Sequence, residues 1–244
     1  MSKRNLTQIV AHRGGALLWP ENSLEAFRRS LALGVDQLEC DVHLSADGVP
    51  VVIHDPTLER TTLGQGPVAM RSAAELQATR LRGSETDTVP RLVDLAALLA
   101  GTSAKLQVEI KGAQTHDLLQ RSLDVLDQAG IRDRCLIIAF DAGVAAAAQQ
   151  AGGLADVIWL FGARHIREVG IEGAIATARN HGFRFVETEI GALDEAAVAA
   201  FRDAGLKVAA WGANDSAMLE KAYDLGLDAV ATDDPVLALR LRGA

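Results

Sequence analysis

One complete structural unit of the chain is the stretch Asp194-Glu-Ala-Ala-Val-Ala-Ala-Phe-Arg-Asp-Ala-Gly205-Leu-Lys-Val-Ala-Ala-Trp211. Its first residue is an aspartate of the kind that caps a helix, and residues 194–204 have an Ala-rich helical pattern. Gly205 stands where a helix should end, and a short apolar run, Lys207 to Trp211, follows it. The stretch therefore predicts a helix that leads through a glycine into a buried strand.

The same alternation of strand and helix runs through the whole chain and occurs eight times. Eight such units in about 250 residues are typical of a closed (β/α)8 barrel, the TIM barrel, and this is the α/β fold that the sequence predicts. The expected strands are Gln8 to His12, Gln37 to His43, Leu106 to Lys111, Cys135 to Phe140, Asp156 to Phe161, Arg184 to Glu189, Lys207 to Trp211 and Asp228 to Thr232. The expected helices lie near 23–33, 91–100, 115–129, 142–150, 170–181, 194–204, 215–225 and 235–242.

The regular spacing breaks once, after the second strand. Val51-Val52-Ile53-His54 form an extra extended segment, and roughly 35 residues rich in Thr, Gly, Arg and Ser follow it. A loop this long inside a compact domain is usually functional or carries a small subdomain. We therefore expect residues 1–244 to form a single barrel domain, with an insertion at about 55–89 over the mouth formed by the C-terminal ends of the strands.

Composition excludes several classes of function. The net charge is -8 and no run of Lys or Arg is present, which argues against nucleic acid and anionic membranes as partners. No segment has the roughly 18 consecutive apolar residues of a transmembrane helix, so no integral membrane association is expected. Two cysteines and the lack of a secretory leader favour a reduced, cytoplasmic protein. Composition leaves the oligomeric state open.

Three carboxylates are expected at one end of the barrel. Glu39 and Asp41 are two residues apart on the second strand and therefore face the same side, and Glu109 comes from the neighbouring strand. Carboxylates that point into a packed barrel are costly unless they are paired or bind a cation. A hard divalent cation with oxygen ligands is one solution. Salt bridges to Lys111 or Arg13 are the other.

Two histidines complete the inventory of a phosphodiester site. His12 precedes Arg13 at the end of the first strand, and His54 ends the extra segment. A lone histidine at a strand end is more often a packed or capping residue, but two beside an arginine fit acid and base catalysis. Arg13 suits two phosphate oxygens, and Lys111 supplies a second positive charge. We therefore expect metal-assisted cleavage of a phosphodiester.

The ordered motifs of the chain resemble those of the glycerophosphodiester phosphodiesterases, in their bacterial, cytoplasmic type. The resemblance covers nearly the whole length, and a single His-Arg-Gly would be weak evidence beside the full set. The motifs are Ala11-His-Arg-Gly-Gly with Pro20-Glu-Asn-Ser23, Leu38-Glu-Cys-Asp-Val-His-Leu44, Asp47 to Thr62, Val108-Glu-Ile-Lys111, Gly205 to Asn214 and Thr232-Asp-Asp-Pro235.

The resemblance implies hydrolysis of glycerophosphodiesters to an alcohol and sn-glycerol 3-phosphate. It also implies that a neighbouring hydroxyl of the substrate attacks the phosphorus, so that a cyclic phosphate forms and water then opens it. Which histidine is the acid and which is the base stays open. The implied site consists of the acid and base pair His12 and His54, the phosphate-binding Arg13 and Lys111, an aromatic wall at Trp211, and Mg2+ or Ca2+ at Glu39, Asp41 and Glu109.

Two other activities remain as alternatives. A lysophospholipase D would use the same site on a lysolipid, but acyl chains need exposed apolar surface and the stretch from Thr57 to Val89 is mostly polar. A non-catalytic barrel that binds phosphorylated ligands would normally lack a histidine or a metal carboxylate, and this chain has all of them. Soluble diesters are therefore the expected substrates, with the preferred alcohol undetermined.

Some polar residues near these motifs have two interpretations. Glu187 and Glu189 share one face of the sixth strand and either contact the substrate or meet water as strand-end charges. His43 is expected past the end of its strand, in a solvated or supporting position. Glu21 either supports Arg13 or simply occupies the first turn of a helix, where acidic residues are favoured.

Three assignments concern caps and orientation. Asn22 with Glu25 three residues later predicts the start of a helix. Asp233 is interpreted as a helix cap at the end of the last strand. Asp55 is expected to orient His54 or shape the insertion rather than to act as a fourth metal ligand.

Overall fold

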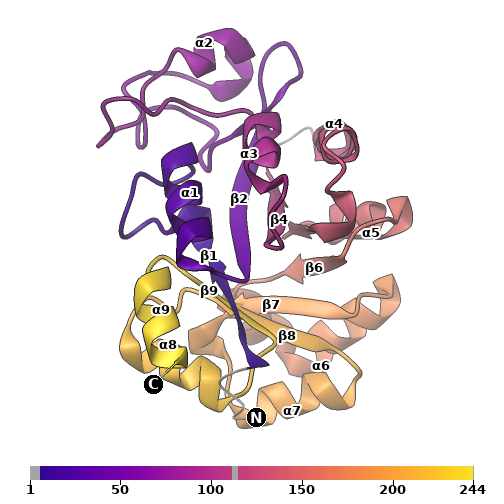
Figure 1. The fold of residues 1–244 in the computed structure, drawn as a ribbon. Helices are drawn as coiled ribbons and strands as arrows, with labels where there is room; N and C mark the ends of the chain where they lie inside the picture. Colours follow the sequence, from indigo (N-terminus) through magenta and orange to yellow (C-terminus); the bar gives the residue numbers. More distant parts are fainter. Residues whose placement is uncertain (1–5, 112–114, 244) are drawn as a thin grey trace.

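The computed structural model describes residues 6–111 and 115–243 and forms a closed parallel barrel surrounded by helices (Figure 1). The strand order is β1-β9-β8-β7-β6-β5-β4-β2, and pairing of β1 with β2 closes the ring. The predicted TIM barrel is therefore confirmed. Its strands are β1 Gln8–Ala11, β2 Gln37–Leu44, β4 Lys105–Ile110, β5 Cys135–Ala139, β6 Asp156–Leu160, β7 Phe185–Glu189, β8 Lys207–Trp211 and β9 Ala229–Thr232.

Several of the outer helices begin at side-chain caps, and the helices cover the barrel with their apolar faces. Asp194, Asp215 and Asp234 each accept a hydrogen bond from the backbone three residues ahead, as the sequence predicted for Asp194. No helix in the described part of the chain is long and apolar enough to cross a membrane. The helices are α1 Leu24–Leu33, α3 Leu92–Leu99, α4 Thr115–Gln128, α5 Ala142–Ala151, α6 Ala163–His181, α7 Glu195–Asp203, α8 Ser216–Asp224 and α9 Pro235–Arg242.

The predicted cap of the first helix was wrong by one residue. Ser23 caps α1, because its hydroxyl accepts a hydrogen bond of 3.0 Å from the backbone N-H of Ala26. Asn22 instead has a left-handed backbone with φ of 57° and is 2% exposed. Its side-chain amide donates to Asp41 Oδ2 at 2.9 Å. A contact with a distant strand therefore determines the role of Asn22, and local helix signals do not reveal it.

Apolar side chains fill the interior of the barrel below its mouth. One cluster inside the ring includes Val10, Ile138, Ile158, Leu160 and Phe185, and each of them is at most 5% exposed. Burial of a side chain of this size contributes about 1.5–3 kcal/mol. A second and larger cluster lies between the strands and the outer helices. The barrel is therefore a solid support, and polar chemistry is confined to the ends of its strands.

The segment after β2 forms a small unit with its own apolar core. It begins with β3 Pro50–Val52, which pairs antiparallel with β2, and contains the short helix α2 Ala73–Gln77. In Figure 1 this segment lies beyond the ends of β2 and α3, away from the body of the barrel. Its buried side chains are Val51, Ile53, Leu58, Val68, Leu76, Leu81 and Val89. This core gives the segment a defined shape beside the barrel mouth, where His54 begins it.

Candidate active site

Three carboxylates meet inside the barrel mouth because β2 and β4 pair in register. Asp41 is the direct neighbour of Glu109 across the two strands, and Glu39 lies two residues earlier on the same face of β2. The three side chains are buried, and they offer oxygen atoms that all lie within 4.8 Å of one another. The structure thus brings together the three residues that the sequence predicted as metal ligands.

The crowding of three carboxyl groups in a buried site raises the pKa values of two of them. Burial and the nearby Asp41 raise the pKa of Glu39 to about 8, and the same two causes raise the pKa of Glu109 to about 7. Glu39 Oε1 and Asp41 Oδ1 are buried and accept no hydrogen bond from the described residues. Hard oxygen donors without partners at this spacing fit a divalent cation.

Two basic side chains border the cluster and form the salt bridges that the sequence offered as an alternative. Lys111 Nζ lies 2.8 Å from Glu109 Oε1 and 3.4 Å from Asp41 Oδ1. Arg13 Nε lies 3.3 Å from Asp41 Oδ2. Burial would raise the pKa of Asp41, but the charges of Lys111 and Arg13 outweigh it and lower that pKa. These ion pairs keep Asp41 charged, whereas no lysine or arginine side chain among the described residues forms an ion pair with Glu39.

His12 lies directly after β1 in a 3-10 turn, and a carboxylate from the other end of the chain holds its ring. Its Nδ1 donates to Asp233 Oδ1 at 2.6 Å, and Asn214 Nδ2 donates to the other oxygen of Asp233 at 2.6 Å. Its Nε2 lies 3.9 Å from Glu39 Oε2. Burial would lower the pKa of His12, but Asp233 and Glu39 outweigh it and raise the pKa to about 9.

The turn after β1 depends on an unusual backbone. Arg13 has φ of 50°, and Gly14 has φ of 80°. A Cβ atom on Gly14 would lie 2.9 Å from the Cβ atom of Ala26, so glycine is required on both conformational and steric grounds. The turn directs the backbone N-H of Arg13 to Glu39 Oε2 at 2.8 Å. It thereby fixes one carboxylate and places the Arg13 side chain beside Asp41.

His54 is held by residues of the insertion and of the loop after β1. Its Nδ1 donates to Asp55 Oδ1 at 2.6 Å, which confirms that Asp55 orients His54. Arg60 donates to both oxygens of Asp55 and also to Glu21. Burial lowers the pKa of His54, although Asp41 and Asp55 partly oppose this effect. The two histidines therefore have opposite pKa shifts, although each is held by an aspartate at Nδ1.

Three supporting residues differ from the sequence interpretation or escaped it. Asp233 is not the helix cap, because Asp234 caps α9 and leaves Asp233 free to bind His12. His43 was expected past its strand, but β2 continues to Leu44 and His43 is 7% exposed. Its Nε2 lies 2.9 Å from the backbone oxygen of His54. Arg60 lies within the motif Asp47 to Thr62, but the sequence gave it no role of its own.

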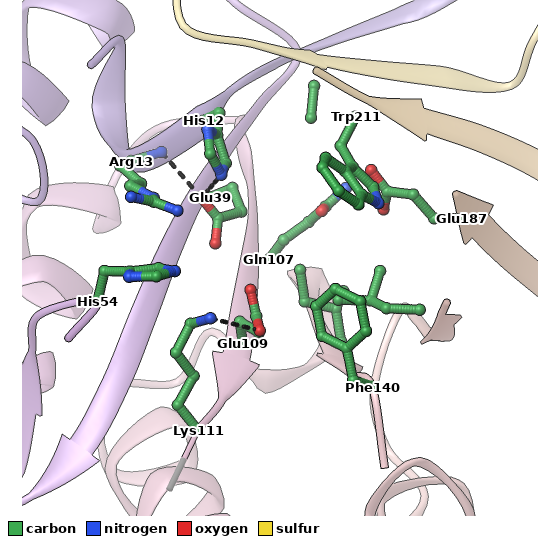
Figure 2. Close-up of a pocket in the computed structure, with 13 residues that line it drawn as sticks. His12, Arg13, Glu39, His54, Gln107, Glu109, Lys111, Phe140, Glu187 and Trp211 are labelled. Atoms are coloured by element: carbon green, nitrogen blue, oxygen red, sulfur yellow. Dashed lines mark hydrogen bonds and ion pairs between the residues drawn. The ribbon is translucent and has the colours of Figure 1, made fainter. Parts of the chain in front are cut away.

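The two histidines and most of the charged residues expected to act on the substrate line one pocket of about 170 Å³ at the barrel mouth (Figure 2). Every predicted site residue lines it except Asp41, which lies fully buried next to it. Glu21 supports Arg13 through a contact of 3.1 Å, which settles the choice that the sequence left for it. Glu187 also lines the pocket, whereas Glu189 does not. The volume is below the roughly 300–1,000 Å³ of pockets for drug-sized ligands and suits a small polar group.

Comparisons with known proteins agree on one family. The model of the glycerophosphoryl diester phosphodiesterase family matches residues 12–237. A glycerophosphodiester phosphodiesterase of Caldanaerobacter subterraneus subsp. tengcongensis is 25% identical over 243 residues, covering 96% of this chain and 97% of the relative. A solved structure from Agrobacterium tumefaciens has a TM-score of 0.94 at 27% identity over 98% of both chains. An Oleispira antarctica phosphodiesterase solved with the product sn-glycerol-3-phosphate has a TM-score of 0.87 at 27% identity, with full coverage of both chains.

Proposed function

The chain belongs to the glycerophosphoryl diester phosphodiesterase family and hydrolyses glycerophosphodiesters to an alcohol and sn-glycerol 3-phosphate, and we propose that His12 and His54 carry out the proton transfers of this reaction. The observation that supports these roles is a pair of aspartate-held histidines on the same pocket as three buried carboxylates. Acid and base groups must stand on both sides of a phosphodiester that loses an alkoxide. The pocket offers both.

The opposite pKa shifts of the two histidines support a division of roles between them. His12, whose pKa is raised, is the general acid, and His54, whose pKa is lowered, is the general base at neutral pH. Because Asp233 and Asp55 occupy the Nδ1 positions, Nε2 is the nitrogen that each ring offers to the substrate. A bound cation would offset part of the charge of Glu39 and would therefore lower the pKa of His12.

In the first step, each proton moves between named groups, and one bond to phosphorus forms while another breaks. His54 removes the proton of the glycerol hydroxyl next to the phosphate, and the hydroxyl oxygen bonds to phosphorus. The bond from phosphorus to the alcohol oxygen breaks, and His12 donates its proton to that oxygen. Water then opens the cyclic phosphate with the histidine roles reversed. The substrate thus supplies the nucleophile.

The negative charge of the phosphate requires positive groups in the pocket. We propose that Glu39, Asp41 and Glu109 hold Mg2+ or Ca2+, because their oxygens lie within 4.8 Å of one another and one oxygen each of Glu39 and Asp41 accepts no hydrogen bond from the described residues. A bound cation would neutralise negative charge on the phosphate oxygens. Arg13 and Lys111 line the same pocket and supply positive charge to these oxygens, and the Trp211 ring forms one wall.

Release of sn-glycerol 3-phosphate from glycerophosphocholine tests these roles. His12→Ala and His54→Ala should each lower kcat by about a hundredfold or more, the scale of general acid and base catalysis. His116→Ala is the matched control, because this exposed histidine lies on α4 outside the pocket, and it should retain full activity. Wild-type rates in either active-site variant would refute the assigned proton transfers. Binding of substrate without turnover by the wild type would instead indicate a non-catalytic barrel.

The state of the cysteines bears on the cellular location. Cys40 and Cys135 are both free and buried. Burial raises the pKa of each thiol, which makes both cysteines poor nucleophiles. We propose a cytoplasmic location because unpaired, unreactive cysteines are compatible with a reducing compartment. Fractionation of the native host followed by immunodetection would test this, and recovery outside the cytoplasm would contradict it.

A further inference from the structure

One wall of the pocket is polar but takes no part in the proton transfers or in binding the cation. It consists of Gln107 on β4, Glu187 on β7 and Trp211 on β8. In Figure 2 Glu187 and Trp211 lie on the side of the view opposite Arg13, His54 and Lys111, with Gln107 between the two groups. Gln107 is 1% exposed and Glu187 is 3% exposed. The barrel therefore buries an amide and a carboxyl group where apolar side chains would pack more favourably.

Each of these three side chains has a polar atom without a partner. Among the described residues, Gln107 Oε1, Glu187 Oε2 and Trp211 Nε1 neither donate nor accept a hydrogen bond. Buried polar atoms in this condition destabilise a fold, and their concentration in a pocket indicates groups that a ligand satisfies. The three atoms comprise two acceptors and one donor.

The direction of the Gln107 amide follows from its neighbours inside the barrel. Its Nε2 donates to Gln37 Oε1 at 2.9 Å, and the amide of Gln37 in turn donates to Gln8. This chain of three glutamines uses the donor end of Gln107 and leaves its oxygen for the pocket. Gln107 is therefore prepared as an acceptor for a group that carries an O-H or N-H.

We propose that Gln107, Glu187 and Trp211 form a subsite for the terminal hydroxymethyl group of the substrate's glycerol moiety. A hydroxyl group donates one hydrogen bond and accepts others, so it matches carboxyl or amide oxygens together with an indole N-H. A phosphate would face two acceptors here. A trimethylammonium group has no N-H for these oxygens and would leave the indole donor unsatisfied. Ile138 and Leu160 line the same pocket and suit the carbon atoms of glycerol.

This assignment rests on the proposed function and orients the substrate within it. The glycerol end points to the wall of β4, β7 and β8, so the leaving alcohol lies toward the open mouth. Acylation of the terminal hydroxyl removes its O-H and adds a chain that a pocket of about 170 Å³ does not hold. The subsite therefore selects unacylated glycerol and disfavours lysolipids, whereas the identity of the alcohol affects binding less.

The test compares two substrates that differ only at the terminal hydroxymethyl group. Glycerophosphocholine has this group, and its analogue built on 1,2-ethanediol lacks it but keeps the hydroxyl next to the phosphate. Wild-type kcat/KM should favour glycerophosphocholine by about tenfold or more, the effect of losing about one buried hydrogen bond. Glu187→Leu should remove most of this preference, and Glu187→Gln should retain most of it because the amide oxygen still accepts. Lysophosphatidylcholine should be the poorest substrate of the wild type.

Glu189→Leu is the matched control, because Glu189 lies two residues further along β7 on the same face and does not line the pocket. It should leave the preference unchanged. An equal rate loss on both substrates in Glu187→Leu would overturn the subsite, and so would a wild-type enzyme with no preference. If Glu187→Leu does not fold, Trp211→Phe, which removes the indole N-H and part of the ring surface but keeps an aromatic side chain, should lower the preference for glycerophosphocholine.

A binding measurement separates this proposal from the proposed function. Calorimetric titration with sn-glycerol 3-phosphate and with 2-hydroxyethyl phosphate requires no turnover. The wild type should bind the glycerol compound about tenfold more tightly, and Glu187→Leu should bind the two compounds equally. Equal affinities in the wild type would overturn the subsite even if hydrolysis is observed. Absence of hydrolysis with the expected difference in affinity would reject the proposed function and keep the subsite.

Discussion

Asp233→Asn should weaken His12 as a general acid while leaving its position almost unchanged. The backbone N-H of Asp233 donates to Asn214 Oδ1 at 2.8 Å, which fixes the Asn214 amide so that its Nδ2 donates to the side chain at position 233. An asparagine at 233 must then present its oxygen to Asn214 and its NH2 group to His12. The NH2 group is a donor, so the Nδ1 of His12 has to accept. The protonated ring, which carries N-H on both nitrogens, is thereby destabilised.

The size of the effect follows from the bond that is lost. A hydrogen bond to a charged group contributes about 1.5–3 kcal/mol, and both partners are mostly buried, with side chains 25% and 20% exposed. At 1.36 kcal/mol per unit, the pKa of His12 should fall by about one to two units. A general acid acts while protonated, so the alkaline limb of the kcat/KM profile should move to lower pH by this amount. A fall of this size from a pKa of about 9 lowers the protonated fraction at pH 8 by about twofold to tenfold, and we expect kcat/KM at pH 8 to fall by the same factor.

The assay is release of sn-glycerol 3-phosphate from glycerophosphocholine at saturating cation between pH 5 and 10. Asp234→Asn is the matched control, because asparagine caps a helix about as well as aspartate and Asp234 accepts from Leu237 rather than from His12. This control should reproduce the wild-type profile. An Asp233→Asn enzyme with an unshifted alkaline limb and a rate within twofold of the wild type would refute the assignment of His12 as an aspartate-held acid.

Three further predictions follow from the same site. Exhaustive chelation should abolish hydrolysis and Mg2+ or Ca2+ should restore it; full activity after chelation would reject a cation cofactor. Metal-free protein should lose thermal stability as the pH rises from about 5 to 8, because the pKa values of Glu39 and Glu109 in the folded protein exceed their ordinary value. Added cation should therefore raise Tm more at pH 8 than at pH 6. An increase in Tm that does not depend on pH would contradict this expectation. Arg60→Gln should lower kcat/KM by less than about fivefold, because Arg60 is half exposed. In the pH profile of kcat/KM it should move only the acid limb, because Arg60 acts on the base His54 through Asp55.

Local patterns were sufficient to predict the barrel and the carboxylate cluster. Strand parity places Glu39 and Asp41 on one face whatever the rest of the chain does, and parallel pairing brings Glu109 to their level. The alternation of helix and strand then closes the ring. Glu187 shows the limit of parity. Strand parity placed Glu187 and Glu189 on the same face. The two residues differ in their depth in the barrel mouth, so Glu187 lines the pocket and Glu189 does not.

Contacts between distant parts of the chain explain what the sequence did not reveal. Asp233 and His12 are separated by 221 residues and meet only because β9 pairs with β1 when the barrel closes. Locally, an aspartate before a proline-initiated helix indicates a cap, and Asp234 satisfies that signal. His43 was misplaced for a related reason. The antiparallel partner β3 extends β2 beyond its parallel pairing, and this partner lies in the insertion.

The two histidines therefore depend on different parts of the molecule. His12 is held through Asp233 and Asn214, which follow strands of the barrel itself. His54 is held through Asp55 and Arg60, which belong to the insertion. The barrel strands are buried and pack in a continuous core, whereas the insertion has only a small core of its own. Local opening is easier where fewer apolar side chains are buried, so loss of the base by opening of the insertion should precede loss of the acid as the protein is destabilised.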